Sequence, residues 1–207
     1  MITVKKVADL VNSEKAKVNY YVYDEQSVRN YMFSLVAISG DERKHYEDMC
    51  DVEKQEYIST SAEILMPKMS VDRCANIYRN NDLYNFQYTL EKVHSLEKIH
   101  VNDLSTAFSL YIILHEFGHW NDFVSKDKKP FHYNMPDSEE AREVFEYRKK
   151  IQDRMAIKQE PDEEDKEMMK EYIKRYNAVP IERRANDYAD KNYKSAYSIL
   201  RQGGIVH

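Results

Sequence analysis

The sequence is poor in glycine, proline and cysteine, and each shortage excludes a class of protein. Its 207 residues include 4 Gly, 5 Pro and 2 Cys. So few Gly and Pro residues argue against turn-rich sandwiches and barrels and favour long helices. The only adjacent glycines are Gly203 and Gly204, and the absence of any Gly-x-Gly pattern excludes a glycine-rich phosphate loop. Cys50 and Cys74 lack CxxC spacing, so we expect ordinary reduced thiols.

Long apolar runs and an excess of positive charge are also missing. The longest apolar stretch, residues 107–114 interrupted by Ser109, is too short to cross a bilayer. Residues 1–17 carry lysines but no apolar region of the kind found in a secretory signal. The net charge of −5 gives no sign of a positively charged surface that could bind the phosphate backbone of a nucleic acid. We therefore expect a cytoplasmic protein without a membrane partner or direct nucleic-acid binding.

The residues that are present predict a predominantly helical α+β fold. Hydrophobic residues make up 42% and charged residues 32% of the chain, which is the balance of a folded globular domain. Apolar spacing predicts helices near residues 4–11, 28–40 and 71–78, and strands are expected at 20–23 and 58–65. The highly charged segment 41–56 is expected to form an exposed helix. Residues 83–99 are ambiguous, because their first half alternates like a strand and their second half has helical spacing.

The clearest helix runs from about Asn102, which can cap it, to Phe123. Its middle is apolar nearly all round, which predicts that it is buried in the core. Two charged amphipathic helices should follow, one from a capping box near Asp137 and one after Pro161. A final helix should run from near Pro180 to about residue 200. The first of the charged helices is expected to bury Ala141, Val144, Phe145, Ile151 and Met155.

The residues that point to chemistry lie late in the buried helix. His115, Glu116 and His119 form an HExxH motif. Residues i and i+4 share a helix face, so both imidazoles can bind one zinc ion. Glu116 lies beside them and can act as the general base for a water molecule. A buried pair of histidines and a glutamate costs free energy unless it is paired or metal-bound, which favours a metal site.

A catalytic zinc site usually has three protein ligands, and the best downstream candidate for the third is Glu182. Glu182 and Asn186 are i and i+4 on the final predicted helix, so they share a face. Asn186 can then accept the ring N–H of a ligand histidine and orient it. Other carboxylates remain open as the third ligand, namely Glu139, Glu140, Glu143 and Asp122.

The two motifs together resemble a known family. HEFGH followed by ExxANxYA is similar to the ImmA/IrrE-type metallopeptidases, a gluzincin-like group found in bacteria and mobile elements. The resemblance implies that His115, His119 and Glu182 bind zinc and that Glu116 is the catalytic base. It also implies a minimal zincin-like core, in which a small sheet packs on the HExxH helix. Because members are associated with cutting transcriptional repressors, it suggests a protein substrate, such as a repressor of a phage or mobile element.

We therefore expect one metallopeptidase-like domain over residues 1–207. It would comprise an N-terminal helical and strand part (1–100), an active-site helix (101–124), a helical insertion (125–178) and a third-ligand helix (179–207). Two alternatives remain: a non-catalytic zinc-binding protein-interaction module, and a zinc hydrolase of a non-peptide substrate. A structural zinc site would need a fourth protein ligand and would have no use for Glu116. The sequence gives no oligomeric state.

Two further features bear on the site. Gly118 lies inside the motif helix, where glycine costs about 0.5–1 kcal/mol relative to alanine. This suggests that a neighbouring element or a substrate approaches the helix backbone closely at that point. Four further histidines, namely His45, His94, His100 and His207, have no ligand spacing and are expected to be non-functional.

Overall fold

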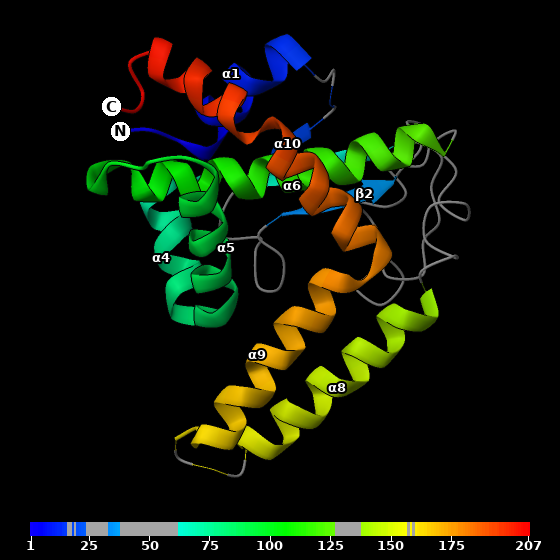
Figure 1. Ribbon diagram of the computed structural model, residues 1–207. Helices are drawn as coiled ribbons and strands as arrows, with labels where there is room; N and C mark the ends of the chain where they lie inside the picture. The colour runs from blue at the N-terminus through cyan, green and yellow to red at the C-terminus, as the bar shows by residue number, and fades with distance from the viewer. Residues whose placement is uncertain are drawn as a thin grey trace.

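The computed structural model describes residues 1–15, 18, 20–23, 33–37, 62–126, 138–156, 158 and 160–207. Most of them are helical, and three strands form one small sheet, so the predicted α+β, predominantly helical fold is confirmed. The elements in chain order are α1 (Val4–Lys15), β1 (Tyr20–Tyr23), β2 (Ser34–Ala37), β3 (Ala62–Pro67), α4 (Val71–Asn81), α5 (Leu83–Leu96), the 3₁₀ turn η2 (Val101–Asp103), α6 (Leu104–Ser125), α8 (Ser138–Ala156), α9 (Glu163–Ala178) and α10 (Pro180–Gln202) (Figure 1).

The sheet has the strand order β1-β3-β2 and packs against α6. β1 runs parallel to β3, with Tyr20 opposite Ile64, and β2 runs antiparallel to β3, with Leu35 opposite Ile64. Ile64 and Met66 are two residues apart in β3, so they share one face of the sheet, and both are fully buried. The central strand therefore contributes directly to the core around α6.

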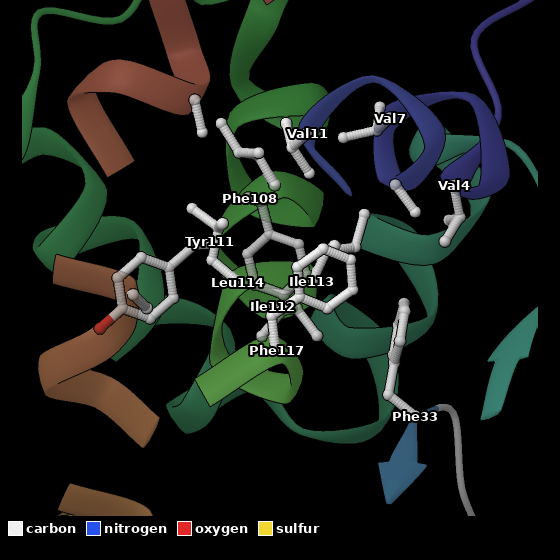
Figure 2. Packing of buried hydrophobic residues seen from close by; sticks show 14 of the residues in the cluster. Val4, Val7, Val11, Phe33, Phe108, Tyr111, Ile112, Ile113, Leu114 and Phe117 are labelled. Carbon is white, nitrogen blue, oxygen red and sulfur yellow. The ribbon is translucent and has the colours of Figure 1, made fainter. Parts of the chain in front are cut away.

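Helix α6 forms the centre of the main core. Apolar residues on all sides of its middle are buried, as the sequence predicts. Figure 2 shows Val4, Val7 and Val11 of α1, together with Phe33 beside β2, gathered around side chains of α6. Helix α10 lies along another side of α6 and runs in the opposite direction. This pairing brings the two predicted motif segments together.

Helices α8 and α9 form a pair that extends from the body of the molecule (Figure 1). They share a smaller apolar cluster, which includes Val144, Ile151 and Tyr172. A capping box between Asp162 and Asp165 begins α9. The two helices predicted for the insertion are therefore present.

Three local predictions are wrong. The helix predicted over 28–40 is a strand at Ser34–Ala37, because a short apolar run fits either structure and pairing with β3 decides it here. Asn102 does not cap the motif helix, since it lies within η2 and Asp103 occupies the N-cap position of α6. Phe145 is 52% exposed and does not belong to the α8–α9 cluster, because its ring meets only the edge of that pair, 6.4 Å from the ring of Tyr176.

Other predictions are resolved or fall outside the described residues. The ambiguous segment 83–99 is helical as far as Leu96. The predicted helix at 41–56, the start of the strand at 58–61 and the cap at Asp137 all fall outside the described ranges. Cys74 is a buried free thiol. Within the part of the chain that the structure describes, no helix is both long and apolar enough to cross a membrane.

Candidate metal centre

Helix α6 presents the two motif histidines on one face, a single turn apart. The Nε2 atoms of His115 and His119 lie 3.1 Å from each other. Their rings meet edge to face, with centroids 4.7 Å apart and an interplanar angle of 89°. The i, i+4 spacing therefore converges two ring nitrogens on one point, as the motif predicts.

Helix α10 brings Glu182 to the same point. Pro180 begins α10, at a position where a helix needs no N–H from the residue. Glu182 therefore lies in the first turn of α10. Its Oε2 lies 3.2 Å from Nε2 of His115 and 3.6 Å from Nε2 of His119. Glu182, which is 63 positions beyond His119 in the chain, thus completes one compact group of three ligand atoms.

The three atoms have the spacing that a tetrahedral metal ion requires. Zn–N and Zn–O bonds of 2.0–2.1 Å imply ligand-to-ligand distances of about 3.3–3.4 Å in a tetrahedral site. The observed 3.1, 3.2 and 3.6 Å bracket that value. Oε2 of Glu182 is buried without a hydrogen-bond partner among the described residues, and a cation is the kind of partner it lacks. His115, His119 and Glu182 can therefore hold a metal ion.

The electrostatics of the group follow from its burial. Burial alone would raise the pKa of the Glu182 carboxyl, but the close imidazoles of His115 and His119 outweigh it and hold the pKa well below its usual range. Glu182 is therefore an anion beside two imidazoles. An anionic carboxylate and two neutral ring nitrogens form the donor set of many catalytic metal sites.

Glu116 lies next to the ligand group and is almost fully buried. Its exposed fraction is 9%, and burial raises its pKa, while the charges of His119 and His115 lower it in part. Glu116 and His115 both line a cavity of about 150 Å³. The rest of its wall is formed by Phe33, Tyr78, Asn85, Tyr88, Thr89, Tyr111, Ile112, Tyr176, Asn177 and Asn186. A carboxylate thus opens onto a space beside the candidate metal site.

A chain of two amides supports His115 from behind. Asn186 Oδ1 lies 2.9 Å from Nδ1 of His115, so the ring can donate its N–H to the amide. Asn186 in turn donates from Nδ2 to Oδ1 of Asn177 at 2.8 Å. This fixes the amide orientation and leaves Nε2 of His115 facing the ligand group. The structure places Asn186 where the sequence expected it, and its role in metal binding stays a prediction.

The other candidate ligands lie elsewhere. Asp122 is paired with Arg184, at 2.9 Å, and with Lys126, at 3.6 Å. Glu139 and Glu143 are exposed on α8. Glu140 also belongs to α8, and its side chain is outside what the structure describes. Of the described carboxylates, only Glu182 groups with the two histidines.

Sequence reasoning missed what α9 contributes to this site. Tyr176 is partly buried and lines the cavity, and burial together with the nearby charges of Glu182 and Glu116 raises its pKa. Asn177, the next residue, holds Asn186. No sequence motif identifies Tyr176 or Asn177, because their position at the site depends on how α9 packs against α10. The end of the insertion is therefore part of the site.

The sequence assigned no function to His100 and His207, because they lack ligand spacing. The fold brings both of them together with Asp103 in a second group of described residues that could hold a metal ion.

In comparisons with known proteins, no family model, curated protein or solved structure matches this chain.

Proposed function

We propose that this chain is a zinc-dependent metallopeptidase that hydrolyses a peptide bond in an intracellular protein. The observation that carries the proposal is the largely buried triangle of His115, His119 and Glu182, in which Oε2 of Glu182 has no hydrogen-bond partner among the described residues and beside which Glu116 is buried. Among the described residues the group has three members. Three protein ligands leave a position for water and substrate, whereas structural zinc sites are closed by a fourth.

The donor set favours zinc over harder cations. Two imidazoles and one carboxylate suit zinc and its transition-metal neighbours, while magnesium and calcium prefer sites built from oxygen alone. Zinc, when bound here, would supply Lewis-acid polarisation of the scissile carbonyl and would lower the pKa of a water molecule toward 7.

The residues of the chain would then perform the proton transfers and the positioning. Glu116 would accept the proton of the attacking water and deliver it to the leaving amine. Asn186, held by Asn177, would keep the His115 ring in the orientation and tautomer that direct Nε2 to the metal. The cavity beside Glu116 would receive part of the substrate next to the scissile bond.

The kind of substrate is argued from the resemblance of the two motifs. HExGH followed by ExxANxYA is similar to the ImmA/IrrE-type metallopeptidases, and that similarity favours a peptide bond in a protein such as a transcriptional repressor. HExxH alone does not name the bond that is cleaved. A direct search for the substrate is therefore part of the test.

The experiment compares the proteomes of cells that produce the wild type or the Glu116→Gln variant. Glu116→Gln keeps the shape of the side chain but removes its basicity, so it should retain the bound metal and generate no fragments. Fragments that appear only with the wild type, and that the purified wild type makes from the purified substrate, would support the proposal. Equal cleavage by both proteins would overturn the mechanism. Metal binding without any cleavage would favour a non-catalytic binding module.

A further inference from the structure

A second group of metal-type ligands lies at the opposite end of the α6–α10 pair. His100 comes just before η2, Asp103 lies at the start of α6, and His207 follows α10. Figure 1 shows the end of the chain returning to this end of α6. Asp103 precedes His115 by 12 residues, which is about 18 Å along a helix at 1.5 Å per residue. The group is therefore separate from the candidate metal centre.

Asp103 is the anchor of this group. It occupies the N-cap position of α6, yet its side chain makes no capping hydrogen bond. The carboxylate is buried, with 3% of the residue exposed, and both of its oxygens face His207. The backbone N–H of His207 donates to Oδ2 at 2.8 Å, and the ring Nδ1 lies 3.1 Å from Oδ1. The buried carboxylate of Asp103 therefore contacts His207, far along the chain, and does not cap its own helix.

His207 is held in place at its backbone. Its N–H donates to Asp103, and its main-chain oxygen accepts a hydrogen bond from Nε of Arg201 at 3.2 Å. Its side chain is 74% exposed. The residue therefore presents a ring beside a buried anion while remaining open to solvent, which gives a metal ion a path of entry.

His100 supplies the third donor. Its ring centroid lies 5.4 Å from that of His207, and ligand atoms of all three residues lie within 4.8 Å of one another. That limit is wider than the spacing of about 3.3 Å in a tetrahedral site. His100 is exposed and is engaged by a long hydrogen bond of 3.3 Å from Asn102 N–H to Nδ1. Rotation of the exposed His100 ring would bring its nitrogen closer to the ligand atoms of Asp103 and His207. The backbone N–H of Asn102, which is exposed, would then donate to water instead.

We infer that His100, Asp103 and His207 form a second site for a divalent transition metal such as zinc. Two imidazoles and one carboxylate are its protein donors, and water completes the coordination on the exposed side. A metal bound there links the segment after α10 to the start of α6, and so holds together the two helices that carry the first site. This inference does not depend on the proposed peptidase activity.

The test is a titration of the metal-free protein with Zn²⁺ by isothermal calorimetry. The protein should carry no polyhistidine tag, because a tag binds the same metal. The wild type should bind two equivalents, and His207→Ala and His100→Ala should each bind one. His94→Ala removes a histidine of α5 from outside the group, and it should retain both equivalents. Glu182→Gln should lose the first site and keep the second.

Two results would overturn the inference. One is a wild type that binds a single equivalent, which Glu182→Gln loses. The other is a His207→Ala variant that still binds two. If a variant is suspected of misfolding, its circular dichroism and thermal unfolding without metal decide the matter. With zinc present, the wild type should gain more thermal stability than a well-folded His207→Ala, and equal gains would also contradict the second site.

Discussion

The backbone of Ala185 in α10 lies so close to Gly118 in α6 that no side chain fits between them. A β-carbon on Gly118 would be 2.7 Å from both the Cα and the carbonyl oxygen of Ala185, and 3.0 Å from Cβ of Tyr188. This close approach lies one residue before His119 and three residues after Glu182. It allows the carboxylate of one helix to reach the imidazoles of the other. The helix-weakening glycine inside the motif is therefore needed for its contact with α10.

Gly118→Ala should destabilise the protein and weaken metal binding. Alanine would favour the isolated helix by about 0.5–1 kcal/mol, but the clash is with backbone atoms that cannot rotate away. Overpacking of this kind costs about 1–3 kcal/mol and would push α10 and Glu182 away from the histidines. Urea unfolding and zinc titration measure the two effects.

Gly203→Ala is the matched control for this substitution. Gly203 has a φ of −77°, and the nearest atom to an added β-carbon is 3.4 Å away. This variant should leave zinc affinity unchanged. A Gly118→Ala protein as stable as the wild type, with the same zinc affinity, would show that the close approach has no role in the site.

Asn186→Ala should weaken metal binding without unfolding the protein. Loss of a partner that orients a ligand histidine typically lowers metal affinity by roughly 10–100-fold. Asn177→Ala should have a smaller effect in the same direction, because it acts on His115 only through Asn186. Asn192→Ala, which removes a hydrogen bond to Tyr188 O on the same helix, should not change zinc affinity. Equal affinities in all three variants would contradict the supporting role of the amide chain.

Glu182→Gln should lower zinc affinity by more than the roughly 10–100-fold expected for an orienting residue, because it removes the charge of a direct ligand. Glu143→Gln is the control, since it tests one of the carboxylates that the sequence left open and lies exposed on α8. Competition with a chromophoric chelator gives both affinities. A large loss in Glu143→Gln and none in Glu182→Gln would transfer the third ligand to the insertion.

The α8–α9 pair should lose stability in acid through Asp165. Hydrogen bonding from Lys158 is the main cause that holds the pKa of Asp165 below its usual range, and Arg154 adds to it at 2.5 Å. A carboxyl whose pKa is lower in the folded state stabilises that state above its unfolded pKa, near 3.9. That stability is lost as the pH falls through the lower, folded pKa.

Asp165→Asn tests this pH dependence directly. The variant should be less stable than the wild type at pH 7, and the difference should shrink as the pH falls below about 4. Urea midpoints at a series of pH values give the comparison. A difference that stays constant down to pH 2 would show that the charge of Asp165 is not its cause.

The sequence predicted helices correctly where the apolar residues had clear helical spacing or where a start signal marked the first turn. The apolar spacing from Val4 to Val11 and the start signal at Pro180 both led to correct helices. Leu35 and Val36 were misassigned, because two adjacent apolar residues fit a helix and a strand equally. Only pairing with β3, far along the chain, decides between them.

In the candidate site too, the sequence predicted contacts within one helix but not contacts between helices. His115 and His119 are related by a local helical period, so the sequence could bring them together. Tyr176 and Asn177 reach the site only because α9 packs against α10. His100 and His207 are more than a hundred residues apart and meet because α6 and α10 run in opposite directions. Spacing within a single element carries no information about such contacts.

The most direct measurement is anomalous X-ray scattering at the zinc absorption edge from a crystal of the wild-type protein. We expect a strong peak within bonding distance, about 2.0–2.2 Å, of Nε2 of His115, Nε2 of His119 and a carboxylate oxygen of Glu182. Data collected below the edge should show this peak greatly weakened. A zinc-loaded crystal with no anomalous peak at these three atoms would contradict the proposed metal centre.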